Sequence, residues 1–247
     1  MWIPESDRRS WVRYLPPRWI FDGTAVCGIP TELSRAMLRG WHGHNGVTLG
    51  VPGLGFVCTM QTTDGQPGLE GYYVEEDRPL EPDERVRFRP DERPPGAAVD
   101  LPAPDWDAVR LAKVERNYAM NYIRTILPVL CSVLGPADAA AVGRIAATQI
   151  GMQYHGAVMA TVGADGPFAT RLGRILGGHG TPAAVDGDIV TLDSWRVFDG
   201  VSIHPAVFEA WNGLWDGLAA MEGLRLVVTD RLDLGDAVFR WEVRPAR

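Results

Sequence analysis

A proline-rich, charged segment divides this sequence into two parts whose hydrophobic residues recur with different periods. The segment EEDRPLEPDERVRFRPDERPPGAAVDLPAPDW occupies residues 75–106. Proline removes a backbone donor and restricts the residue before it, so no long helix or strand is expected there beyond one short strand, RVRFR. We therefore predict a boundary between residues 90 and 105, with an N-terminal subdomain over 1–95 and a C-terminal domain over 96–247.

The N-terminal subdomain is predicted to be rich in β-strands, with one short helix. The stretch PTELSRAMLRG has Thr31 as a candidate N-cap and Gly40 as a candidate stop. After it, the runs LGFVCTMQT and GYYVEE have the composition of strands. The residues Asp64 and Gly65 between them are typical of a hairpin turn.

The C-terminal domain changes to a helical period and then returns to strands. Its predicted order is three helices, a strand, a helix and a terminal hairpin, and no internal repeat is visible. The fold class is therefore α+β: an antiparallel sheet packed against helices, with a β-rich N-terminal subdomain. In the first helix, the apolar residues Val114, Tyr118, Tyr122, Ile126 and Val133 follow one stripe.

Composition excludes several classes of protein. The net charge of -7 and the absence of an uninterrupted basic run argue against a nucleic-acid partner. No run reaches the roughly 18 to 20 apolar residues of a membrane span, and the first residues lack the apolar core of a signal peptide, so we expect a cytoplasmic protein with no membrane partner. Of the 24 basic residues only Lys113 is lysine, which indicates a GC-rich bacterial genome.

The stretch GWHGHNG raises the question of a metal site, because two histidines in an extended segment can share a face. A third ligand does not follow His42 and His44 at a suitable spacing. A glycine-rich loop at the entrance of a strand, which could line a pocket, is the better interpretation. The three cysteines also lack metal or disulfide spacing. We therefore expect no metal and no other cofactor.

Cys27 is a candidate nucleophile. It precedes a predicted helix start, where the helix dipole favours a thiolate, and the glycine after it would let a substrate approach. The alternative is a small buried hydrophobic residue, as most unpaired cysteines are.

The second long helix carries the least expected pattern. Thr148, Met152, His155 and Met159 share one face in a helix otherwise made mainly of small and aliphatic residues. Burying such polar groups without partners would cost about 1 to 3 kcal/mol each, so they face water or line a polar cavity. His155 is the candidate general acid or base, and the candidate substrate-binding residues beside it are Gln149 and Tyr154.

Two further pairs are candidates for the same site. Asp193 and Trp195 share a face of a predicted strand, where the carboxylate could orient His155 and the indole could form an apolar wall. The alternative for Asp193 is a surface ion pair. Asn121 and Arg124 could bind a substrate carboxylate, or belong to a solvated helix face.

The part after the proline-rich segment resembles the L-2-amino-thiazoline-4-carboxylic acid hydrolase-like family of small bacterial α+β proteins. The likeness lies in the long helices, the strand DIVTLDSWRVF, the Trp-rich helix and the ending LGDAVFRWEV. Such proteins often carry a cysteine in the last strand, where Val238 and Phe239 stand here, so no cysteine-dependent activity is carried over.

From these features we predict a metal-independent enzyme of bacterial specialised metabolism. It would hydrolyse a small polar nitrogen-containing compound or open its ring. The alternative is a non-catalytic module that binds a small molecule. Either is compatible with a homo-oligomer.

Overall fold

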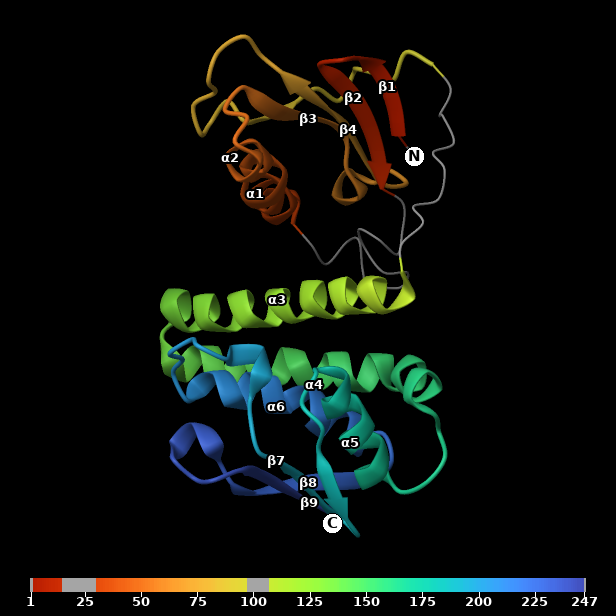
Figure 1. Ribbon diagram of the computed structural model, residues 1–247, viewed down its shortest axis with the longest axis vertical. Helices are drawn as coiled ribbons and strands as arrows, with labels where there is room; N and C mark the ends of the chain where they lie inside the picture. Colours follow the sequence, from red (N-terminus) through yellow and green to blue (C-terminus); the bar gives the residue numbers. More distant parts are fainter. Residues whose placement is uncertain (1, 15–29, 97–106, 247) are drawn as a thin grey trace. The chain divides into compact units, whose positions relative to one another are not determined.

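The chain has the predicted α+β fold, in which antiparallel sheets pack against helices (Figure 1). The computed structural model describes residues 2–14, 30–96 and 107–246. The chain divides into Met1–Pro104, called unit 1, and Asp105–Arg247, called unit 2. Each unit has its own sheet and is described by itself.

Unit 1 is a five-stranded sheet with the order β1-β2-β4-β3-β5. Neighbouring strands are antiparallel except β5, which runs parallel to β3. A helical segment lies between β2 and β3 in the chain. The elements are β1 (Trp2–Ser6), β2 (Arg9–Tyr14), α1 (Thr31–Trp41), η2 (His42–His44), α2 (Asn45–Leu49), β3 (Leu54–Met60), η3 (Thr62–Asp64), β4 (Leu69–Glu75) and β5 (Val86–Phe88).

Both faces of this sheet carry apolar clusters. Leu38 of α1 packs with Phe56 and Leu69 on one face. Trp11 and Val57 pack on the other face. Because β4 and β5 flank β3 and clusters cover both its faces, its five central residues are buried.

The predicted ends of α1 were wrong. Pro30 is the N-cap, and the Thr31 hydroxyl instead donates a 2.9 Å hydrogen bond to Asp64 Oδ1 in the turn between β3 and β4. Gly40 does not end the helix, which continues to Trp41. Both residues had the right chemistry for a cap, but tertiary contacts of the hairpin turn and the following η2 decided the boundaries.

Unit 2 begins with three helices, followed by four strands that form one sheet, with one further helix between the second and third of these strands. The sheet order is β6-β7-β9-β8, with every neighbouring pair antiparallel. The elements are α3 (Ala108–Leu134), α4 (Pro136–Val162), α5 (Phe168–Gly178), β6 (Ala184–Asp186), β7 (Ile189–Leu192), η4 (Arg196–Phe198), α6 (Ala206–Ala220), β8 (Leu224–Asp230), η5 (Leu232–Leu234) and β9 (Phe239–Pro245).

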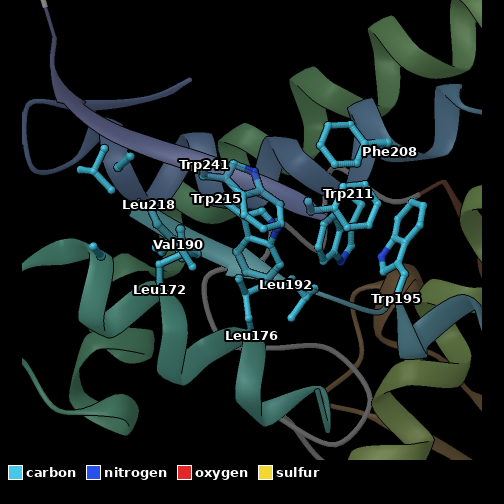
Figure 2. Close-up of a cluster of buried hydrophobic side chains, with 14 of the residues drawn as sticks. Leu172, Leu176, Val190, Leu192, Trp195, Phe208, Trp211, Trp215, Leu218 and Trp241 are labelled. Carbon is cyan, nitrogen blue, oxygen red and sulfur yellow. The ribbon is translucent and has the colours of Figure 1, made fainter. Parts of the chain in front are cut away.

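A tryptophan-rich core joins α6 to the sheet (Figure 2). Trp211 and Trp215 come from α6 and Trp241 comes from β9. Their rings contact one another, with Trp211 at 5.4 Å from Trp215 and 6.0 Å from Trp241 between centroids. The buried Trp241 Nε1 donates a 2.8 Å hydrogen bond to Asn212 Oδ1, which satisfies the indole N–H inside the core.

The helices α4 and α6 approach each other closely because glycines face the contact. A Cβ atom on Gly217 would lie 2.1 Å from the carbonyl oxygen of Thr148. A Cβ on Gly151 would likewise lie 2.3 Å from the carbonyl oxygen of Leu214. The absence of side chains at these positions therefore sets the distance between the two helices.

The long helix α3 is apolar on two opposite faces. One face packs against the core through Met120, Ile123, Leu127 and Cys131. The predicted stripe is a different face and is exposed to solvent: Val114, Tyr118, Tyr122, Ile126 and Val133. The periodicity identified the helix, but it did not identify the side that faces the core.

The two units contain the same β-β-α-β-β arrangement, which the sequence does not reveal. The order β1-β2-β4-β3 in unit 1 corresponds to β6-β7-β9-β8 in unit 2, with α1 and α6 in equivalent places between the hairpins. The final hairpins have equal lengths, so residues 54–75 correspond to residues 224–245. Both β3 and β8 carry an irregularity at the same place, Cys58–Met60 and Val228–Asp230.

The hairpin turns share a hydrogen bond from a backbone N–H to a side chain at equivalent positions. The backbone N–H of Gln61 donates to the side chain of Gln66 at 3.0 Å, and that of Arg231 donates to the side chain of Asp236 at 2.7 Å. A single glycine in the left-handed region follows each 3₁₀ turn, Gly65 with φ 79° and Gly235 with φ 105°. The repeat therefore lies in the backbone and its turn geometry, where few residue identities are needed to maintain it.

Candidate functional site

A histidine, a glutamate and an arginine meet in unit 2. His155 Nε2 on α4 lies 3.0 Å from Oε1 of Glu222, in the turn after α6. The other oxygen of Glu222 accepts a hydrogen bond from Nη2 of Arg171 on α5. Arg171 is only 8% exposed. We call this arrangement the His155–Glu222 dyad, with Arg171 as its third member.

Local chain geometry explains how the three groups meet. Gly163 and Gly166, with φ of 85° and 83°, let the chain turn between α4 and α5. Arg171 Nη1 donates to the carbonyls of Ala164 and Gly166 in this turn, at 3.1 and 2.6 Å. Its guanidinium is thereby fixed and can hold the Glu222 carboxylate beside His155.

The dyad has the chemistry of an oriented imidazole. When Nε2–H donates to Glu222, the carboxylate fixes the ring orientation and stabilises the imidazolium that forms on proton uptake. Nδ1 is then the basic nitrogen, and it has no hydrogen-bond partner among residues 107–246 or the other described ranges. The His155 side chain is 21% exposed, so it is not sealed from solvent.

Asp193 does not orient His155. Its carboxylate is exposed and accepts a 3.2 Å hydrogen bond from the Ser194 hydroxyl, whereas Glu222 lies beside the imidazole. Glu222 could not be identified from the residue spacing around His155, because the two residues are 67 positions apart in the chain. The available sequence signal was a carboxylate directly before Gly223, since glycine is typical of helix ends.

Trp195 lies in the core and not on a strand. The predicted strand extended to Phe198, but β7 ends at Leu192 and η4 follows. Adjacent Val197 and Phe198 are both buried, which a strand with one buried face cannot achieve and a 3₁₀ turn can. Trp195 packs edge-on to Phe198 at 4.6 Å between centroids.

The remaining predicted binding residues lie on the helices of unit 2. On α4, Gln149 is exposed and Tyr154 is half-buried next to His155. On α3, Asn121 is exposed, and Arg124 Nη2 donates a 2.8 Å hydrogen bond to the backbone carbonyl of Asp199. Arg124 therefore fixes the segment after η4, and Tyr154 is the binding candidate that is adjacent in sequence to the dyad. Cys27 lies outside the described residues.

The histidines of GWHGHNG lie in a 3₁₀ turn between α1 and α2, so the expected loop at a strand entrance was wrong. His42 is buried and its ring lies 4.4 Å from that of Phe56, 5.8 Å from Tyr14 and 6.0 Å from Tyr73. Burial lowers the pKa of His42 to about 4. His44 is exposed, so the two imidazoles do not share a face. Within the described ranges, no three His, Cys, Asp or Glu side chains are grouped to hold a metal ion.

A cleft of about 430 Å³ borders strand β8 in unit 2, and we call it the β8 cleft. Arg144 of α4 contacts Asp216 at 3.0 Å, and Arg231 contacts Glu209 at 2.7 Å. Burial raises the pKa of the Asp216 carboxyl. The lining residues are Arg144, Phe208, Glu209, Asn212, Asp216, Arg225, Leu226, Val227, Val228 and Arg231.

Comparisons with known proteins assign no family to the chain. No protein-family model matches it, and no curated protein matches it. A solved structure, the trafficking protein particle complex subunit 3 from Naegleria fowleri covalently bound to palmitic acid, is similar with a TM-score of 0.43 and 16% identity. The similarity covers 55% of this chain and 97% of that chain, and a TM-score of this size supports no conclusion about function. Among the described helices, none has the length and apolar character needed to cross a membrane.

Proposed function

We propose that this chain is a metal-independent hydrolase of a small polar nitrogen-containing compound, with His155 as general acid and base. The observation that carries the proposal is the 3.0 Å contact between His155 Nε2 and Glu222 Oε1, with Arg171 fixing the glutamate. The resemblance of the C-terminal sequence to the aminothiazoline carboxylate hydrolase-like family agrees with this reaction class.

The proposed reaction requires one proton to move in two steps. Nδ1 of His155 removes a proton from water as the water oxygen attacks the electrophilic carbon of a C=N or C=O group. Glu222 stabilises the imidazolium that results. His155 then gives the proton to the leaving nitrogen as its bond to carbon breaks, which restores the neutral imidazole. Tyr154 and Gln149 would bind polar groups of the substrate, since both lie on α4 with His155.

Replacing His155 with alanine is expected to lower turnover by about 10²- to 10⁴-fold, the usual contribution of proton-transfer catalysis. The assay follows the hydrolysis of L-2-amino-thiazoline-4-carboxylate and a panel of cyclic amidines and amides by product chromatography. His44→Ala, which removes an exposed histidine from unit 1, is the matched control and should keep the wild-type rate.

Chemical rescue separates a catalytic from a structural role. Added imidazole should restore part of the rate of His155→Ala, because it supplies the missing base, and it should leave the wild type unchanged. Unchanged turnover in His155→Ala, or no turnover of the whole panel by the wild type, would contradict the proposal.

The alternative is a non-catalytic module that binds a small molecule in the β8 cleft. The observation that favours it is the polar lining of that cleft, which does not include His155. In that case His155→Ala would leave binding unchanged, and no panel compound would be consumed.

A further inference from the structure

The internal repeat shows a strand in unit 1 that has no counterpart in the described part of unit 2. In unit 1, β5 pairs parallel with β3 at Phe56, Val57 and Cys58. The backbone N–H of Phe56 donates to Arg85 O at 2.8 Å, and that of Arg89 donates to Cys58 O at 2.9 Å. In the part of unit 2 that the structure describes, β8 is the edge strand of its sheet.

The β8 cleft lies at the position that β5 occupies in unit 1. Residues 226–228 are the counterparts of residues 56–58, and with Arg225 they line the cleft. The side chains of residues 56–58 are at most 3% exposed under β5, whereas those of residues 226–228 are only half-buried. The edge therefore presents outward backbone groups beside a preformed space.

We propose that the β8 edge binds an extended peptide segment of a partner protein, which pairs parallel with β8 as β5 pairs with β3. The inference is independent of the His155–Glu222 dyad. Main-chain hydrogen bonds supply affinity in this mode of recognition, and the alternating side chains supply specificity.

On the side of the bound peptide segment that faces the helices, we expect apolar and aromatic residues. In unit 1, Val86 and Phe88 pack on the α1 side of the sheet, and the guanidinium of Arg35 lies 4.8 Å from the centre of the Phe88 ring. In unit 2 Arg144 lines the cleft, whereas Phe208 is only 1% exposed and is covered by the guanidinium of Arg231, 4.1 Å from the centre of its ring. An aromatic ring at this position would lie beside the arginine side chains of the cleft, Arg144 and Arg231.

On the opposite side of the bound peptide segment, we expect an acidic residue. In unit 1, Arg87 points away from α1 and forms a 2.8 Å ion pair with Glu76. The counterpart of Glu76 in unit 2 is Ala246, and the counterpart of Gly55 is the exposed Arg225. A carboxylate in the place of Arg87 would lie opposite Val227 and diagonal to Arg225 on the same face, within reach of that long side chain. The preferred segment is therefore apolar–acidic–aromatic.

The test uses three fluorescein-labelled peptides and the full chain, with binding measured by fluorescence anisotropy and by backbone NMR shifts. The first peptide is Glu-Arg-Val-Glu-Phe-Arg, which copies residues 84–89 around β5 but carries glutamate in the place of Arg87. The second has arginine at that place, and the third is the first peptide with its final residue N-methylated. The N-methyl group removes the donor that corresponds to Arg89 N.

The glutamate peptide is expected to bind saturably, with shifts confined to β8 and the cleft, and about fivefold more tightly than the arginine peptide. N-methylation should weaken binding about fivefold, as expected for one lost hydrogen bond. Arg225→Glu should reverse the preference between the two charged peptides. Lys113→Glu, an exposed substitution on α3 with the same change in net charge, should leave the preference unchanged.

Three results would overturn the proposal. The first is no saturable binding of the glutamate peptide at millimolar concentration. The second is equal binding of the N-methylated peptide, which would mean that no strand pairing occurs. The third is a dimer in sedimentation that Arg225→Glu dissociates, which would assign the edge to a second copy of the chain.

Discussion

Replacing Gly217 with valine is expected to unfold unit 2, with a loss of more than about 4 kcal/mol in the free energy of unfolding. A Cβ at this position would lie 2.1 Å from Thr148 O and 3.0 Å from Met152 N, both backbone atoms of α4. Backbone cannot rotate away as a flexible side chain can, so α4 and α6 would have to separate. Their separation would expose the tryptophan-rich core, which α6 joins to the sheet.

The measurement is urea unfolding followed by near-ultraviolet circular dichroism, which reports packed tryptophans: Trp195, Trp211, Trp215 and Trp241 in unit 2, and Trp11 in unit 1. Gly156→Ala is the matched control, because Gly156 lies in α4, the helix that Gly217 of α6 contacts, and a Cβ there meets nothing within 4 Å. It should stabilise the chain by about 0.5 to 1 kcal/mol through helix propensity. A native near-ultraviolet signal with an unchanged midpoint in Gly217→Val would show that the helices are not in close contact.

Acid is expected to destabilise unit 1 by about 3 kcal/mol through His42 alone. Burial lowers the pKa of His42 from 6.5 to about 4, so below pH 6.5 the unfolded chain binds a proton that the folded chain does not. The stabilisation of the folded state by neutral His42 is therefore fully present above pH 6.5, and it is lost as the pH falls from 6.5 to about 4. The replacement His42→Phe should remove this loss, because a phenyl ring fits among Phe56 and Tyr73 without a proton to bind.

Cys58 provides a reporter for unit 1. Its side chain is 3% exposed and burial raises its pKa to about 12, so it should react with a thiol reagent only after unit 1 opens. In a Cys27→Ser, Cys131→Ser background, urea titrations with dithiodipyridine at pH 7.5 and pH 5 give the stability of unit 1 directly. His42→Phe should lose less stability than the parent between these pH values. An equal loss in both proteins would show that His42 is already protonated in the folded state.

Those parts of the fold that depend on local sequence could be predicted. The hairpin around Asp64 and Gly65 forms where expected because the glycine adopts a positive φ that the turn requires. The helices of unit 2 and the terminal hairpin also follow from their periods and stops. Each of these features is decided by residues a few positions apart.

Features that depend on distant contacts could not be predicted. Glu222 reaches His155 only because α4, α5 and the end of α6 come together, and nothing in the sequence near His155 indicates it. Trp195 had the alternation of a strand residue, yet the aromatic core draws Val197 and Phe198 inward together. The exposed stripe of α3 has the same period as a buried one, so period alone cannot choose the inner face.

The repeated hairpins raise a question of folding fidelity, because equal lengths and equal turns would let β3 pair with β9, or β8 with β4. Gly71 lies opposite Cys58, and a Cβ there would already be 2.2 Å from Val57 O and 2.6 Å from Phe56 Cζ. Its counterpart is the fully buried Trp241, opposite Val228. An exchanged pair would force an indole into the space of a hydrogen atom in one unit and leave a cavity in the other. One glycine and one tryptophan thus make each hairpin compatible with its own unit, and they penalise mispairing between similar segments of a single chain.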